Sequence, residues 1–158
     1  MVLVGFAISA GHAAVLDLTP FLKDRLEDKG CQSRGMDFDF HQASSRDGEL
    51  TDQQFKQHVI RSKDISGESA TRWDVSYTLK DTTYRGIPVK SMQFVIGKSY
   101  DASQRIVLDL RKAADKQKFN HIKFNQSKQS DMAPQIEKTA HSAEIYCYLG
   151  NRFGMDEM

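Results

Sequence analysis

The sequence lacks a charge excess and any long apolar run. Its 22 basic side chains are almost balanced by 21 acidic ones, for a net charge of +1. Nucleic-acid-binding domains usually carry a strong basic excess, so we expect no nucleic-acid partner. No segment reaches the roughly 20 apolar residues that a membrane-spanning helix needs, so we expect no membrane span in the mature chain.

The sequence also lacks the short motifs of common enzymes. It has no G-x-S-x-G, no Walker loop, no dinucleotide fingerprint and no H-E-x-x-H. This favours a protein that is not an enzyme and needs no cofactor. Many small hydrolases have no legible motif, so an enzyme stays an alternative.

The first residues are typical of an export signal. Residues 2–14 contain no charged side chain, and Gly11 and Ala13 provide the small residues of a cleavage site. The basic start of a signal peptide is missing, and a buried N-terminal strand is the alternative. We expect residues 1–13 to be a signal peptide, residues 14–158 to form a single α+β domain, and the protein to be periplasmic or secreted.

The two cysteines are Cys31 and Cys147. In an exported protein we expect them to form one disulfide that closes most of the chain into a loop. Two free buried thiols become the favoured alternative if the protein is not exported. A cysteine nucleophile would need a nearby base, and no recognisable motif surrounds either residue.

Periodicity predicts an antiparallel β-meander of about four to five strands, with two or three short helices packed on one face. The helices are expected over about 20–29, 51–62 and 112–121, with Thr19 as the first N-cap and Gly30 as its stop. Strands are expected over 36–41, 72–80, 87–97, 105–111 and 142–150, with turns at 44–49 and 81–86 and a loop over 125–139.

Alternation predicts which side chains face the core. In the strand at 87–97 the apolar positions change face, which indicates a β-bulge because one extra residue reverses the alternation. The expected inward residues are Trp73, Val75, Tyr77, Leu79, Ile87, Val89, Met92, Phe94, Ile96, Ile106, Leu108, Leu110, Ile145, Cys147 and Leu149.

One cluster could carry chemistry. On a strand, Asp37, Asp39 and His41 would point the same way, and such side chains can hold a divalent metal. A polar strand face exposed to water is the simpler interpretation, and we expect no metal. A small secreted hydrolase built around these residues is the alternative function, and a ligand-carrying module is a further one.

The preferred interpretation is an exported protein that binds another protein, such as an inhibitor or immunity-type protein. Tyrosine supplies contact area with a polar tip, so the candidate partner contacts are Tyr84, Tyr100, Tyr146 and Tyr148. The segment 105–128 has seven basic and two acidic side chains, whereas 17–52 has five basic and nine acidic ones. The basic segment is either an ordinary solvent-exposed surface or one that meets an acidic partner.

Overall fold

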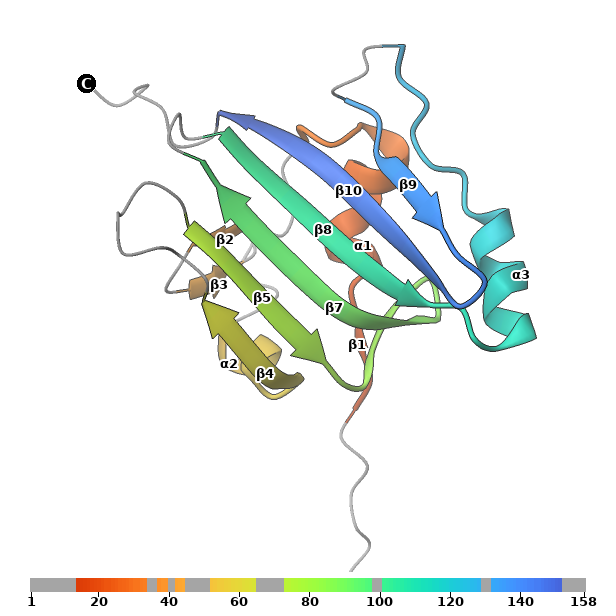
Figure 1. Ribbon diagram of the computed structural model, residues 1–158, viewed down its shortest axis with the longest axis horizontal. Coiled ribbons are helices and arrows are strands. Elements are labelled where there is room, and N and C mark those ends of the chain that lie inside the picture. Colours follow the sequence, from red (N-terminus) through yellow and green to blue (C-terminus); the bar gives the residue numbers. More distant parts are fainter. Residues whose placement is uncertain are drawn as a thin grey trace, which may run out of the picture.

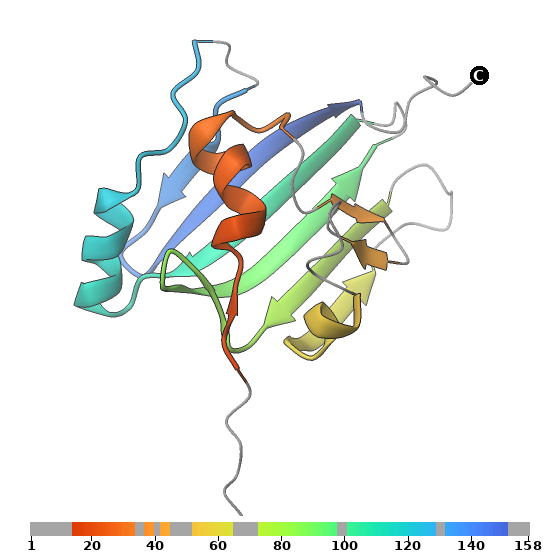
Figure 2. The same ribbon diagram turned by 180° about the vertical axis from the view of Figure 1, so that it is seen from behind.

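The computed structural model describes residues 14–33, 37–39, 42–44, 52–64, 73–97, 101–128 and 132–151. A broad twisted sheet dominates these residues, and one face of it carries helices (Figures 1 and 2). The expected signal peptide, residues 1–13, lies outside the described residues.

Among the described residues, the sheet has eight strands and a separate hairpin pairs two more. The main path runs β1-β6-β7-β8-β10-β9, and β5 pairs with both β4 and β7. The strands are β1 (Leu16–Asp17), β2 (Asp37–Asp39), β3 (Gln42–Ser44), β4 (Val59–Asp64), β5 (Trp73–Leu79), β6 (Thr82–Tyr84), β7 (Ile87–Ile96), β8 (Asp101–Asp109), β9 (Gln135–Lys138) and β10 (Ser142–Asn151).

The described part of the chain also contains four helical segments: α1 (Thr19–Lys23), the π-helical η1 (Asp24–Asp28), α2 (Asp52–Lys56) and α3 (Ala113–His121). The first two are continuous and cross one face of the sheet, on which α2 also lies (Figure 2). The helix α3 lies at one end of the sheet (Figure 1). The expected combination of a sheet with few helices is therefore present.

The prediction of a purely antiparallel sheet of about four to five strands is wrong. β1 pairs in parallel with β6, so the sheet is mixed. The predicted helix over 51–62 ends at Lys56, and Val59 begins a strand that pairs with β5, as suits two consecutive β-branched residues. The predicted loop over 125–139 contains β9, whose Ile136 lies opposite Ile145 of β10.

The core forms between the sheet and the continuous α1–η1 segment. Leu18, Leu22 and Leu26 are fully buried, as the helical spacing predicts. Thr19 is not the N-cap, because the helix begins at Thr19 itself and the Asp17 carboxylate accepts a hydrogen bond from the Thr19 amide. Gly30 ends the segment at a φ of +107°, which favours glycine.

The long strands present the predicted faces to the core. The inward residues of β7, β8 and β10 are buried, and so is Leu110 just after β8. On β5, Leu79 is buried and Tyr77 packs against Phe55 of α2 with ring centroids 5.3 Å apart. Val75 is half-buried, and the side chain of Trp73 lies outside the description.

The predicted bulge of β7 is present. Its register against β8 shifts between Val89 and Ser91, and this places Ile87 and Val89 on the same buried side as Met92. The extra residue therefore reconciles two runs of apolar side chains that a regular strand would put on opposite faces.

Cys31 and Cys147 are joined as predicted. Their sulfur atoms lie 2.11 Å apart and their Cα atoms 5.1 Å apart, within the range of disulfides. Cys31 follows the helical segment directly, and Cys147 lies on the core side of β10. The bond therefore attaches the end of η1 to the sheet.

The described part of the chain contains no helix that is both long enough and apolar enough to cross a membrane.

Candidate functional site

One face of the sheet carries no described helix. It faces the viewer in Figure 1, where β5, β7, β8 and β10 run across it uncovered, whereas α1 and α2 lie behind. We call it the open face. Its side chains alternate along each strand with the core side chains, and many are polar. On β7, β8 and β10 they are Ser91, Gln93, Val95, Asp101, Ser103, Arg105, Val107, Glu144, Tyr146 and Tyr148.

The centre of the open face is hollowed around Arg105 and Tyr146. The two residues lie directly opposite each other on β8 and β10. Both line two hollows, one shared with Gln93 and Ser103 and the other with Glu144. Tyrosine and arginine are both enriched among the residues that dominate binding energy at protein interfaces.

The four tyrosines predicted as partner contacts have different outcomes. Tyr146 and Tyr148 are half-buried on the open face, and the Tyr148 hydroxyl donates to an Asp101 carboxylate oxygen at 2.8 Å. Tyr84 is fully buried, so it cannot contact a partner. The prediction failed there because residues 82–84 form β6 rather than a turn. Tyr100 lies outside the described residues.

Charge changes sign across the open face. Arg61 and Lys63 are exposed on β4, at one edge, and their register partners on β5 lie on the open face. Glu137 of β9 and Glu144 of β10 stand directly opposite each other near the other edge. Like charges in that arrangement repel, so this pair lowers the stability of the sheet. The Arg105 Nε lies 3.7 Å from a Glu144 oxygen and offsets part of the repulsion.

A polar pair beside the centre is already satisfied internally. Asp74 of β5 is only 3% exposed, and it accepts a hydrogen bond of 2.7 Å from Gln93 Nε2. This pair fixes the orientation of the Gln93 amide, which lines the hollow. The hollow in the open face is therefore lined by a polar side chain, Gln93, whose orientation is fixed.

The alternative site at Asp37, Asp39 and His41 gains no support. Asp37 and Asp39 lie on β2, which pairs with β3 as a hairpin, but their side chains are not described. His41 lies outside the described residues. Within the described residues, no three His, Cys, Asp or Glu side chains come together as a metal site.

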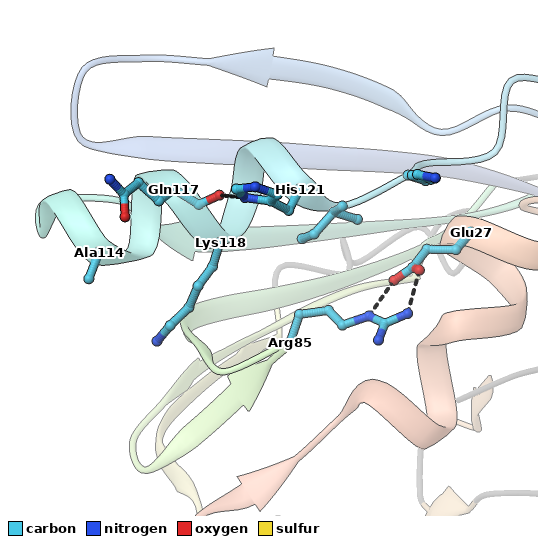
Figure 3. A pocket seen from close by; sticks show the side chains of 8 residues that line it. Glu27, Arg85, Ala114, Gln117, Lys118 and His121 are labelled. Carbon is cyan, nitrogen blue, oxygen red and sulfur yellow. Dashed lines mark hydrogen bonds and ion pairs between the residues drawn. The ribbon is translucent and has the colours of Figure 1, made fainter.

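A second polar cluster joins η1 to the β6–β7 turn. The Glu27 carboxylate accepts from Arg85 Nε at 2.8 Å and from Arg85 Nη2 at 2.6 Å (Figure 3). It also accepts from the Tyr84 hydroxyl at 2.5 Å. Burial acts to raise the pKa of Glu27, but hydrogen bonds from Arg85 and Tyr84 together lower it. The pKa of Tyr84 is raised mainly because its hydroxyl is buried, and to a smaller extent because the hydroxyl is hydrogen-bonded to Glu27.

Sequence reasoning found Tyr146 and Tyr148 but missed most of their neighbours. Arg105 was the start of a predicted strand whose Ile106 and Leu108 were placed inward, so the same alternation would have placed Arg105 outward. Glu137 has no such signal, because residues 125–139 are predicted as a loop. Its position opposite Glu144 follows from the tight turn over 139–141 that joins β9 to β10.

No protein-family model, curated protein or solved structure matches this chain.

Proposed function

We propose that this is an exported protein that binds another protein through the open face, as an inhibitor or immunity-type protein would. The observation that carries the proposal is the hollow around Arg105 and Tyr146 at the centre of a sheet face with no described helix on it. The Arg105 side chain is 49% exposed, so a partner can reach it and bury it.

Charge defines the kind of partner. Arg61 and Lys63 favour a partner with acidic groups over β4. The mutually repelling Glu137 and Glu144 favour a partner with a lysine or arginine over β9 and β10. A cation placed between the two glutamates would remove a repulsion that the free protein contains. Complementary charge of this kind directs both the encounter and the orientation of partners.

Export is proposed because of the disulfide. Disulfides persist in oxidising compartments and are rare in the cytosol. The bond between Cys31 and Cys147 therefore supports a periplasmic or secreted location. Fractionation of the native host, followed by alkylation of free thiols, tests this directly. Two free thiols in cytosolic protein would contradict it.

The binding proposal is tested by site-specific photo-cross-linking in the native host. A photoreactive amino acid at position 146 should form a covalent adduct with one dominant protein, which mass spectrometry identifies. The same amino acid at Lys116, an α3 position away from the open face, is the matched control.

The variant Arg105→Glu, combined with the photoreactive residue at 146, should lose the adduct. If the adduct is lost in Arg105→Glu but still forms in Lys116→Glu, the open face is supported as the binding surface. An equal yield of the adduct from positions 146 and 116, or an adduct that Arg105→Glu leaves unchanged, would refute it.

A further inference from the structure

A cleft separates α3 from the β6–β7 turn and η1 (Figure 3). Its volume is about 640 Å³, which lies within the usual range for small-molecule sites. Ala114, Gln117, Lys118 and His121 line one wall and follow one another at helical spacing along α3. Arg85 and Glu27 form the facing wall. The cleft is separate from the open face, because α3 lies at the end of the sheet.

The cleft has an excess of positive charge. Arg85, Lys118 and Lys123 line it together with a single carboxylate, that of Glu27. Arg85 is paired with Glu27 and Lys118 with Asp115, so the net positive charge of the cleft corresponds to Lys123. The cleft lies within the basic segment 105–128 that stands out in the sequence, and Ile122 and Ala114 add apolar surface to it.

Several of its donors are held in place from behind. Arg85 binds Glu27 through Nε and Nη2, while its Nη1 has no acceptor among the described residues. The His121 Nδ1 lies 2.6 Å from the Gln117 carbonyl oxygen, which can only accept, so Nδ1 carries a proton, and Nε2 can donate to an anion when the imidazole is protonated. Lys118 donates to the Gly86 carbonyl at 3.0 Å and to Asp115 at 3.2 Å.

The Arg85 backbone adds a further constraint. Arg85 has a φ of +53°, a left-handed conformation that is unfavourable for a residue other than glycine. The two-residue turn formed by Arg85 and Gly86 would suit asparagine better at its first position. An arginine there is retained at a cost, and its guanidinium group is positioned before any ligand arrives, which lowers the entropy lost on binding.

We propose that this cleft binds a small organic anion, with its carboxylate or phosphate group between Arg85, His121 and Lys123 and its apolar body against Ile122 and Ala114. Arg85 and Lys123 supply charge-assisted hydrogen bonds to the oxyanion, and His121 adds one when its imidazole is protonated. The apolar lining selects an anion that carries a hydrocarbon group over a bare inorganic ion.

The test is a titration of the ¹⁵N-labelled protein followed by NMR. Phenyl phosphate and benzoate distinguish the phosphate from the carboxylate, inorganic phosphate lacks the apolar body, and phenol lacks the charge. We expect saturable amide shifts confined to residues 85–86 and 113–123 with phenyl phosphate or benzoate. Binding of inorganic phosphate should be weaker, and phenol should cause no saturable change.

The side chains of His121 and Lys123 are exposed and that of Lys116 is half-buried, so conservative substitutions at these positions leave the fold intact. Lys123→Gln should weaken binding about threefold, as loss of one exposed charge contact implies, and His121→Gln should weaken it as well. Lys116→Gln, which removes a charge from α3 outside the cleft, should leave the affinity unchanged.

Three results would overturn the proposal. The first is the absence of saturation by either organic anion, and the second is shifts spread evenly over the basic residues of the protein. The third is an equal loss of affinity in Lys116→Gln and Lys123→Gln. None of them affects the proposed function of the open face.

Discussion

At the scale of single residues, Glu27 connects parts of the chain that are far apart in sequence. Its bonds reach Tyr84 and Arg85, 57 and 58 residues away, and join η1 to the β6–β7 turn. Glu27→Gln keeps the shape of the side chain but removes the negative charge to which three donor groups are hydrogen-bonded. We expect a loss of about 1–3 kcal/mol in the free energy of unfolding, measured by urea denaturation. Asp28→Asn, which affects an exposed pair with Lys23, should cost under about 0.5 kcal/mol, and equal losses would contradict this role.

The same carboxylate predicts how stability depends on pH. The pKa of Glu27 is below its usual value of 4.5 in the folded protein, so the unfolded chain binds the proton more readily. Its contribution is present above about pH 5 and is lost as the pH falls through the folded pKa. Asp109 adds a similar loss at lower pH, because hydrogen bonds from Arg111 lower its pKa to about 2. Glu27→Gln should flatten the stability curve below about pH 5, and an unchanged curve would contradict this.

A variant of Glu137 tests whether binding of a partner accounts for the unfavourable contact between Glu137 and Glu144. Glu137→Gln removes the repulsion with Glu144, so we expect the free protein to gain about 0.2–1 kcal/mol in thermal or urea denaturation. The same change should weaken binding of the partner, since its cation loses one carboxylate. A variant that is less stable, or one that binds the partner more tightly, would contradict the proposed role of the pair.

At the scale of elements, β8 contributes the most regular part of the core. Leu108 is fully buried and lies opposite Val89 beside the bulge of β7. Leu108→Ala should cost about 2–5 kcal/mol in urea denaturation. Val107→Ala, on the open face of the same strand, is the control and should cost much less. A loss under about 0.5 kcal/mol for Leu108→Ala would mean that β8 is placed incorrectly.

The elements also show which features could be predicted from sequence. Strict alternation predicted the faces of β8 and β10, and the change of alternation within β7 predicted its bulge. The edge strands β4 and β9 are not predicted because their side chains are mostly polar and show no regular apolar alternation. Arg25 could not be predicted to be buried, since its Nη1 donates to Gln104 of β8, 79 residues away, at 2.7 Å.

The candidate site was predictable only in part for the same reason. The aromatic residues of the open face follow from alternation along β10. The meeting of Tyr146 with Arg105 requires the register between β8 and β10, which no local pattern specifies, and the meeting of Glu137 with Glu144 requires that the short polar strand β9 be recognised. The hydrogen bonds of Glu27 with Arg85 and Tyr84 likewise depend on how η1 lies across the sheet.

At the scale of the whole molecule, one disulfide closes a loop of 116 residues. Such a loop restricts the unfolded chain, and the chain-entropy model assigns it about 4–5 kcal/mol. We therefore expect reduction by dithiothreitol to lower the urea midpoint strongly, with no chemical role for either sulfur. The double variant Cys31→Ala/Cys147→Ala should reproduce the effect and be insensitive to the reductant. An unchanged midpoint after complete reduction would contradict this prediction.

The central claim is that the open face binds a partner protein, and the affinity of paired variants tests it most directly. With the cross-linked partner purified, isothermal titration calorimetry would compare Tyr146→Ala and Arg105→Ala with Lys116→Ala. Large, central aromatic and arginine side chains often contribute 2 kcal/mol or more at interfaces, so each face variant should bind about 30-fold more weakly or worse. Lys116→Ala should bind as the unmodified protein does. Unchanged affinity in both face variants, with their folds intact, would contradict the account.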